Sequence, residues 1–562
     1  MAKAPLNINM SDKMIPVDFP VLLENIIAEY NTKKTIYDVP IKIIDKKVSY
    51  KNGFMEIEMP FGPAAGPHTQ LAQNIAAGYA GGARFFELKT VQVIDGESLH
   101  INKPCINVPD EGYNIEWSTE ITIEQALDEY VKAYFLLRFM SVEFGLGKSD
   151  GFSFNMSVGY DLQGIKSHKV NTFIDQMKNA APTLIYRKCY QYLEHNLTRY
   201  SRFSVSDLKI MNKSIADSIT VSTMHGCPAD EIEKIAEYLM TAKKVPVYIK
   251  LNPTLNGLAE TQKILADKGY GYIRLVETQF THDLQLGEAV AMLERLLKKA
   301  EALHVFFGVK LTNTLPVEAD GHFQDKQMYL SGKPLFLLAL SVARKLADEF
   351  GDTLPMSFSG GLDGHNIAAM LKTGIHPLTM ATVLLKSRGY RYLAEYADII
   401  AGIGKFPVRP EFGKIDRFMQ LSLQDSYYTK KKSNLPKKKD KLPMLNCKNC
   451  SLCIAVCPNR ANIALYTGDK FQIVHIDAYC NECGNCANYC PYIGKPYRNK
   501  FTVFSSLAEY NVSESNGIIK NQDEIKIRVC KEVEPADSAD CQNLIRAVKH
   551  SVLRCKEDDE NG

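Results

Sequence analysis

The chain has 562 residues, 45% of them hydrophobic and 23% charged, which is long enough for several domains and ordinary for a globular protein. Its 67 basic and 64 acidic side chains leave a net charge of +3, which argues against a nucleic-acid partner. No apolar run is long enough for a membrane span, and residues 1–13 lack a signal-peptide core, so we expect no membrane association and a cytoplasmic location. Fourteen cysteines in that reducing compartment indicate metal or thiol chemistry, not disulfides.

Residues 1–50 are predicted to form an N-terminal extension, with a helix near 19–30 and a hairpin near 41–50. From residue 51 to 425, short apolar strands alternate with amphipathic helices, as in α/β proteins. The predicted strands span residues 56–60, 84–89, 152–158, 218–222, 245–251, 308–312, 354–358 and 378–383. Predicted helices between them include 124–139, 229–241, 286–302, 334–350 and 364–372. This order predicts a (β/α)8 TIM barrel, and a doubly wound open sheet is the competing topology.

The predicted strand ends carry small and polar residues that suit a cofactor site. Residues 64–66 (Ala-Ala-Gly) follow the first strand, where small side chains would let a flat ring approach the backbone. Barrel enzymes bind phosphate with backbone amides after strands seven and eight, which is where residues 359–361 and 381–382 lie. A lysine at the barrel mouth could stabilise the negative charge of a reduced flavin. A Gly-Gly pair after a strand is usually only a turn, so this prediction rests on the ordered recurrence of such residues.

Residues 426–443 are predicted to be a linker, because the stretch 430–441 contains seven lysines and a proline. A charge run of this kind is usually solvated. The functional alternative is the docking of an acidic electron-transfer partner, and a nucleic-acid contact is the weaker choice.

Two runs of cysteines with identical spacing lie within residues 444–500. Each reads C-x-x-C-x-x-C-x-x-x-C-P, the ligand pattern of a two-cluster ferredoxin, in which the fourth cysteine of each run serves the other cluster. The predicted ligand sets are Cys447, Cys450, Cys453 and Cys490, and Cys480, Cys483, Cys486 and Cys457. Zinc fits less well, because zinc sites use two pairs of ligands. We expect an α+β ferredoxin-like domain with two oxygen-sensitive [4Fe-4S] clusters, and therefore an anaerobic host.

The predicted tail at residues 501–562 receives no function. Its Cys530, Cys541 and Cys555 are irregularly spaced and match no ligand set. No G-x-G-x-x-G motif opens a βαβ unit anywhere in the chain, so we expect electrons to come from a separate protein. That donor would be a ferredoxin or an FAD- and NAD(P)H-binding subunit.

The barrel segment resembles the flavin domains of dihydropyrimidine and dihydroorotate dehydrogenases. It is more similar to the YgfK family, named for a selenate reductase subunit, at GVKLTNT (308–314), SFSGG (357–361) and PLTMAT (377–382). The resemblance covers about residues 50–500. It implies an FMN cofactor held by Ala64, Ala65, Gly66, Lys89, Thr90, Lys250, Asn313, Gly360, Gly361 and Thr382.

The same resemblance implies substrate contacts and an acid–base residue. The residues that match the pyrimidine-binding ones are Asn114, Glu116, Asn313 and Thr314. Cys227 matches the cysteine that moves a proton at a ring carbon, and a buried structural thiol is the alternative. The element carries Met224 and Gly226 where the family has asparagine and serine, which favours an altered or larger ring, such as a purine derivative, over uracil.

These features predict an iron–sulfur flavoprotein oxidoreductase that reduces, or reversibly dehydrogenates, a C=C or C=N bond of a pyrimidine- or purine-like cyclic amide. Hydride would pass between the flavin and one ring atom, while Cys227 handles the proton at its neighbour. The alternative is an electron-transfer subunit of a larger redox complex, such as a molybdenum hydroxylase, without a substrate of its own. A glutamate-synthase-like barrel is disfavoured, because Met1-Ala2-Lys3 offers no N-terminal nucleophilic cysteine. A homodimer is also compatible with the sequence.

Overall fold

The computed structural model describes residues 14–45, 49–94, 96, 98–99, 101–115, 118–222, 225–321, 323–432, 438–521, 524–529 and 538–553. Its contacts divide the chain into two compact units. We call Val17–Asn102 together with Ile106–Ser433 the barrel unit. We call Met1–Pro16, Lys103–Cys105 and Asn434–Gly562 the cysteine module. None of the helices in the described ranges combines the length and the apolarity that crossing a membrane requires.

The barrel unit is built on a parallel sheet of eight strands, in the order β5-β16-β15-β12-β11-β10-β9-β6. Their bounds are β5 (Phe61–Pro63), β6 (Phe85–Glu87), β9 (Ser153–Gly159), β10 (Ser218–Ser222), β11 (Val247–Leu251), β12 (Phe307–Leu311), β15 (Met356–Phe358) and β16 (Leu378–Met380). The end strands β5 and β6 are joined by a hydrogen bond from Arg84 N–H to Phe61 O (3.0 Å). The sheet therefore closes into a TIM barrel, as predicted, and is not an open sheet.

The predicted first strand, 56–60, is wrong. Its residues contribute β4 (Met55–Ile57), which pairs with β3 (Tyr50–Asn52) in a separate antiparallel hairpin. The barrel strand is β5, whose Phe-Gly-Pro sequence looks like a turn. Gly62 is needed there because a Cβ atom would lie 1.8 Å from Phe85 O on the neighbouring strand.

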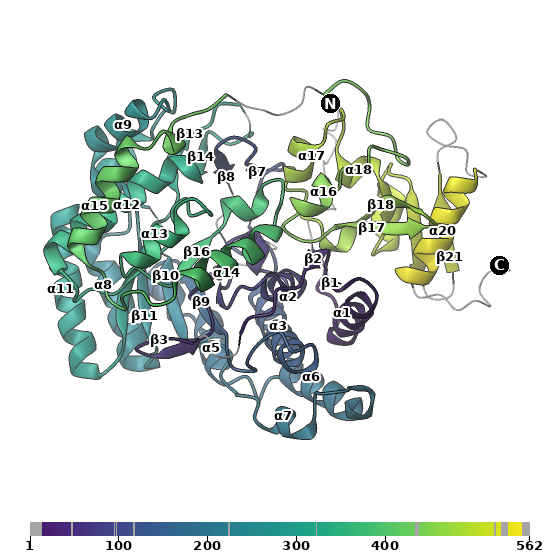
Figure 1. Ribbon diagram of the computed structural model, residues 1–562, viewed down its shortest axis with the longest axis horizontal. Coiled ribbons are helices and arrows are strands. Elements are labelled where there is room, and N and C mark those ends of the chain that lie inside the picture. The colour runs from purple at the N-terminus through teal and green to yellow at the C-terminus, as the bar shows by residue number, and fades with distance from the viewer. Residues whose placement is uncertain are drawn as a thin grey trace, which may run out of the picture. The chain divides into compact units, whose positions relative to one another are not determined.

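Amphipathic helices follow the strands and cover the outside of the sheet, as α8, α11 and α12 do in Figure 1. They include α2 (Ala72–Ala80), α3 (Ile123–Glu143), α8 (Ala229–Tyr238), α11 (Leu286–Leu303), α12 (Lys333–Phe350), α14 (Arg391–Ile403) and α15 (Phe412–Gln424). Thr122 begins α3 with a reciprocal capping box to Gln125. The predicted helix 19–30 is confirmed as α1 (Phe19–Lys33), and it packs within the barrel unit.

Insertions between the strands enlarge the barrel unit. Between β9 and β10 lie α4 (Leu162–Ile165), α5 (His168–Lys178), α6 (Leu184–His195) and α7 (Val205–Lys209), and after β11 come α9 (Leu258–Asp267) and α10 (Glu277–His282). A second, antiparallel sheet contains β7 (Ile106–Asn107), β8 (Gly112–Asn114), β13 (Leu315–Glu318) and β14 (Gln327–Ser331). After β15 comes α13 (Ile367–Lys372). The antiparallel sheet brings loops from the two halves of the barrel together.

The cysteine module contains a five-stranded mixed sheet. Its strands are β17 (Asn462–Thr467), β18 (Lys470–Ile476), β19 (Phe501–Val503), β20 (Gly517–Asn521) and β21 (Glu524–Arg528). Its helices are α16 (Leu452–Ala455), α17 (Asn485–Tyr489), α18 (Pro496–Asn499), α19 (Leu507–Val512) and α20 (Ala539–Ser551). Val474, Phe501, Ile518 and Leu544 share one buried core with Cys541. The segment predicted as a tail after residue 500 thus supplies three strands and two helices to this unit, while Cys530 and Cys555 lie outside the described residues.

Candidate functional site

A cavity of about 870 Å³ lies at the carboxyl ends of the barrel strands. Residues at the ends of all eight strands line it, from Ala64 after β5 to Ala381 after β16. Active sites of TIM-barrel enzymes are found at this end of the barrel, because the loops there converge while the strands stay rigid. The cavity is therefore the candidate active site.

The structure gathers nine of the ten predicted cofactor residues around this cavity. They are Ala64, Ala65, Gly66, Lys89, Thr90, Lys250, Asn313, Gly361 and Thr382. The tenth, Gly360, is not in the cavity wall; a Cβ atom at this position would lie 2.3 Å from the Cβ of Ala339 in α12. Gly360 therefore permits close packing of the loop against that helix.

One end of the cavity has the donors that a phosphate needs. Helix α12 begins there, because its N-cap residue Gly332 and its first residue Lys333 both line the cavity. Gly361 lies beside them at φ +67°, and a Cβ atom would lie 2.4 Å from Gly332 O. Lys386 also lines this region; burial lowers its pKa, and the charge of Lys333 lowers it further. An anion placed here would stabilise the charged forms of both lysines. Neither lysine was predicted from the sequence.

A second cluster of lysines lies on the barrel strands, and one of its members reaches the cavity. Lys250 on β11 lines the cavity, and burial lowers its pKa to about 8, with further lowering by Lys310 and Lys89 and opposition from Glu87. Lys250 is paired in register with Lys310 on β12. Positive charge at this position would stabilise electron density on a bound, reduced flavin, so the donor set fits the predicted FMN.

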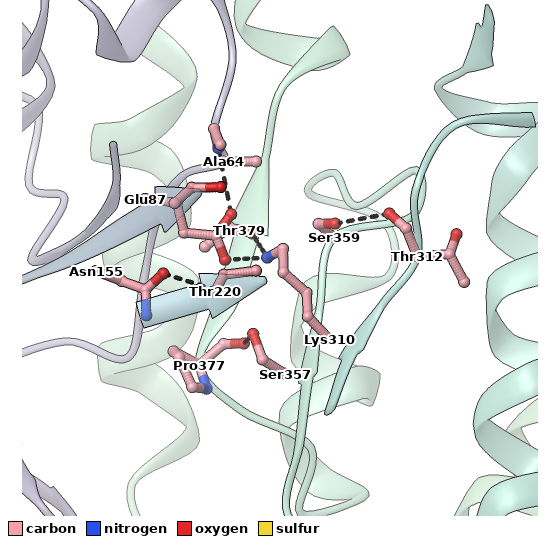
Figure 2. A network of polar contacts seen from close by, with 12 residues as sticks. Ala64, Glu87, Asn155, Thr220, Lys310, Thr312, Ser357, Ser359, Pro377 and Thr379 are labelled. Atoms are coloured by element: carbon pink, nitrogen blue, oxygen red, sulfur yellow. Dashed lines mark hydrogen bonds and ion pairs between the residues drawn. The ribbon is translucent and has the colours of Figure 1, made fainter. Parts of the chain in front are cut away.

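Beneath the cavity, the barrel interior holds a polar network (Figure 2). The fully buried Lys310 forms an ion pair with Glu87 and donates a 2.7 Å hydrogen bond to Thr379 Oγ1. Glu87 in turn accepts the backbone N–H of Ala65 at 3.2 Å. A buried charge pair is stabilised only when further hydrogen bonds satisfy it, and this network supplies them. It connects the loop after β5, which is predicted to contact the cofactor, to the adjacent strand β16 and to β12 across the barrel.

Several carboxamide and hydroxyl groups in the cavity wall lack a protein partner. Gln92 is 1% exposed and its Nε2 donates to Ser118 Oγ (2.9 Å), yet its Oε1 has no partner in the described part of the chain. Gln279 Oε1 and Thr312 Oγ1 are also buried without a hydrogen-bond partner in the described part of the chain, and both residues line the cavity. Buried polar atoms are normally paired, so these unpaired atoms indicate a polar ligand. Gln92 and Gln279 were not predicted, because neither belongs to a recognisable motif.

The predicted substrate residues fall in the same cavity where they can be placed. Asn114 on β8, Asn313 and Thr314 line the cavity, and Gln327 adds another carboxamide. Glu116 lies outside the described residues. Carboxamides can both donate and accept, which suits a ring that carries alternating N–H and C=O groups.

Cys227 and its neighbour His225 differ in position. His225 lines the cavity, whereas Cys227 is not among the lining residues and is half-buried beside α8. Burial raises the pKa of the Cys227 thiol to about 11, and the carboxylates of Glu231, Asp230 and Asp161 contribute to the rise. The thiol stays protonated at neutral pH. Its role as an acid–base residue stays a prediction.

In the cysteine module, charges on cysteines of one run raise the pKa of cysteines in the other run. Burial raises the pKa of Cys480, Cys483 and Cys486, and Cys457 from the first run raises each of the three further. Burial also raises the pKa of Cys453 to about 12; Lys500 opposes this, and the added rise comes from Cys447, Cys450 and Cys490. The fourth cysteine of each run thus acts on cysteines of the other run, and the two ligand sets stay a prediction.

The two cysteine loops repeat one backbone conformation. Asn449 and Ser451 in the first run have positive φ, and so do Glu482 and Gly484 at the equivalent positions of the second. Backbone amides donate to two of the sulfurs, from Ala461 to Cys457 (3.2 Å) and from Glu482 to Cys480 (3.3 Å). These turns and N–H···S bonds fit cluster ligation. Among the described residues, however, no three cysteine, histidine or acidic side chains approach closely enough to form a metal site.

The comparisons with known proteins agree with the barrel geometry. Residues 38–431 match the family model described as oxidoreductase YgfK, N-terminal TIM-barrel domain. The chain belongs to the YgfK family of oxidoreductases. It is 39% identical over 482 residues to the YgfK oxidoreductases of Escherichia coli strain K12 and of Escherichia coli O157:H7. The aligned region covers 81% of this chain and 46% of each relative, so the chain spans about half the length of the curated relatives it matches.

A solved structure also aligns with the chain. It is the dihydroorotate dehydrogenase of Eimeria tenella in complex with ferulenol, with a TM-score of 0.41 and 12% sequence identity. The alignment covers 70% of this YgfK-family chain and 95% of the dehydrogenase.

Proposed function

We propose that this YgfK-family protein is an iron–sulfur flavoprotein that transfers hydride between FMN and a pyrimidine- or purine-like cyclic amide. The observation that carries the proposal is a single cavity of about 870 Å³, lined both by the predicted cofactor residues and by carboxamides with unpaired buried atoms. The flavin supplies the hydride chemistry when bound. The protein's own residues would bind, orient and protonate the substrate.

Different parts of the cavity would have different tasks. The N-terminus of α12 and the side chain of Thr382 would hold the cofactor phosphate, with Lys333 and Lys386 balancing its charge. Lys250 would lie against the flavin ring. The substrate's amide edge would be bound by Asn114, Asn313, Thr314, Gln92 and Gln279. Glu116 remains a further predicted substrate contact.

The cysteine module would carry electrons between this site and a partner protein. We propose one [4Fe-4S] cluster for each of the two predicted cysteine sets, which the repeated loop conformation supports. The expected donor is a ferredoxin or an FAD- and NAD(P)H-binding subunit. The lysine-rich stretch 430–441 is the sequence segment expected to attract such an acidic partner.

The test is anaerobic titration of the dithionite-reduced protein with uracil, xanthine and their dihydro forms, while flavin absorbance is recorded. Reoxidation of the flavin by one ring compound and not by its dihydro form supports the proposal. If the flavin and clusters cycle with dithionite and an oxidant, but no ring compound reoxidises or perturbs the flavin, the protein is instead an electron-transfer subunit without its own substrate.

A further inference from the structure

In the loop after β10, a histidine that lines the cavity is hydrogen-bonded to a buried carboxylate. His225 lines the cavity, and its side chain is 14% exposed. Its Nδ1 lies 2.6 Å from Oδ2 of Asp283, whose side chain is fully buried. Asp283 comes directly after α10, so this pair joins two loops of the barrel mouth. A histidine fixed by a buried carboxylate is the arrangement that proteins use to orient an imidazole for proton transfer.

Asp283 is surrounded by donors, which keeps it ionised. It accepts hydrogen bonds from Gly226 N–H (2.7 Å), Thr254 Oγ1 (2.7 Å) and Asn252 Nδ2 (3.2 Å) in addition to His225. Burial by itself would raise the pKa of this carboxyl, but the hydrogen bonds from His225, Thr254 and Gly226 outweigh it and hold the pKa below its ordinary value. An ionised acceptor requires the hydrogen on Nδ1 of His225.

The other imidazole nitrogen is therefore the one available to a ligand. Within the described ranges, Nε2 of His225 has no hydrogen-bond partner, and the nearest ring is Tyr329, nearly parallel at 6.2 Å between centroids. Tyr329 also lines the cavity. The imidazole is thus fixed on one side by Asp283 and exposed to the cavity through Nε2.

The same carboxylate is connected to a predicted substrate residue. Asn313 Nδ2 donates to Asn252 Oδ1 (2.7 Å), and Asn252 Nδ2 donates to Asp283. Since its amide N–H is used in this way, Asn313 can offer its oxygen to an N–H group of a cyclic amide. One hydrogen-bonded chain therefore links the residue that would bind a ring N–H to the residue that could protonate the ring.

We propose that His225, oriented by Asp283, is the proton donor and acceptor of the cavity, a role that rests on the proposed hydride transfer. In the reductive direction, hydride from the reduced flavin adds to one atom of the substrate C=C or C=N bond. The imidazole enters this step protonated on both nitrogens. Its Nε2–H bond breaks and that proton goes to the other atom, so the π bond is lost, two bonds to hydrogen form, and the imidazole is left with its hydrogen on Nδ1. The substrate gains two electrons, the flavin loses two, and solvent reprotonates Nε2. His225 is the catalytic residue and Asp283 a positioning residue.

Cys227 is the competing candidate, and its surroundings suit the task less well. Proton transfer is most efficient when the pKa of the group lies near the working pH. The Cys227 thiol has its pKa raised to about 11 by burial and by neighbouring carboxylates, and it is absent from the cavity wall. Substitutions of His225 and of Cys227 therefore distinguish which of the two residues transfers the proton.

The kinetic test measures single-turnover reoxidation of the reduced protein by the ring compound that reoxidises the wild type. His225→Gln should slow it by about 10²–10⁴-fold at unchanged FMN and iron content. Asp283→Asn should slow it less and shift the break in the pH profile. Added imidazole should restore part of the rate in His225→Ala, which a purely structural role does not allow. His365→Gln is the matched control, because His365 also lines the cavity and pairs with a carboxylate, Asp425 (2.7 Å), and should keep the wild-type pH break.

A second measurement needs no substrate. Nitrogen-15 NMR of histidine-labelled protein, with the His225 signals assigned by their loss in His225→Gln, should show the tautomer protonated on Nδ1, and Asp283→Asn should change it. The tautomer protonated on Nε2 would overturn the inference. So would an unchanged rate in His225→Gln together with a slow Cys227→Ala. If no ring compound reoxidises the wild type, the proposed function fails, while the NMR result still decides how Asp283 holds the imidazole.

Discussion

The barrel unit and the cysteine module bring their functional groups together in opposite ways. In the barrel, the register of the sheet places these groups side by side. Ser222 lies opposite Lys250, and Lys250 lies opposite Lys310, on three successive strands. In the module, two short runs fold on themselves through left-handed turns such as those at Asn449 and Glu482. The first arrangement depends on the whole sheet, and the second mainly on local spacing. A disruptive substitution should therefore disturb distant residues in the barrel unit, whereas in the cysteine module its effect should stay near the substituted residue.

The largest expected effect is independent loss of each cofactor. Gly361→Ala should remove FMN and leave the iron, because the residue has φ +67° and its new Cβ would lie 2.4 Å from Gly332 O. Cys483→Ser should remove about four of about eight irons and leave the FMN. Acid-released flavin and iron assays measure both. Gly402→Ala is the control for the first variant, since its Cβ would meet no atom within 4 Å. Joint loss of both cofactors in either variant would contradict the comparison.

Next in size is the cost of breaking the buried ion pair. Lys310→Met should destabilise the barrel unit by about 3–5 kcal/mol, because it leaves Glu87 charged and buried. Urea unfolding can be followed by the fluorescence of the single tryptophan, Trp117. Adding Glu87→Gln should recover part of the loss. Lys263→Met, which breaks an exposed pair with Asp267, should cost less than about 1 kcal/mol.

Much of the barrel was predictable because its strands are short apolar segments that end in polar residues. β11 and β12 were recognised in this way, each as a buried run before Asn252 and Thr312. β5 was not, because Gly62 and Pro63 are typical of turns and only the close approach of Phe85 explains them. The sheet of the module was also missed after residue 500, because β20 and β21 alternate weakly and become a core only when α20 covers them.

The site was predictable where one residue type at a strand end suffices, and not where two distant segments must pair. Lys250 was identified from the family resemblance and from its position near the end of an apolar strand. Lys310 lies inside a strand, and nothing in the sequence relates it to Glu87 before the register is known. The histidine before Cys227 was visible as part of a motif, but its partner Asp283 comes from another loop. Pairing of this kind is set by tertiary contacts.

The dependence of the flavin potential on pH tests the barrel's shared electrostatics. Burial, Lys310 and Lys89 lower the pKa of Lys250 to about 8, so its charge is present at pH 7 and lost as the pH rises through 8. A negatively charged reduced flavin would favour the charged lysine, so reduction above pH 8 should take up one extra proton. The midpoint potential should then fall more steeply by about 30 mV per pH unit. Spectroelectrochemical titration of Lys250→Met should show no such break, whereas Lys386→Met should retain it.

The smallest expected effect tests how local the cysteine module is. Residues Lys103–Cys105 belong to this unit, and Cys105 N–H donates to Cys483 O (3.1 Å). The charge of Lys103 lowers the pKa of Cys480 and Cys483, against the dominant effect of burial, so it acts on one cysteine set. A nearby positive charge favours the reduced state of a cluster, so its removal should lower the potential.

Lys103→Met should therefore make the potential of the cluster on Cys457, Cys480, Cys483 and Cys486 more negative by a few tens of millivolts. The cluster on the other set is the internal control and should not shift. Potentiometric titration followed by EPR measures both, and Cys483→Ser identifies which signal belongs to which set. Equal shifts of the two potentials would mean that the clusters share one electrostatic environment, and the contrast with the barrel would not hold.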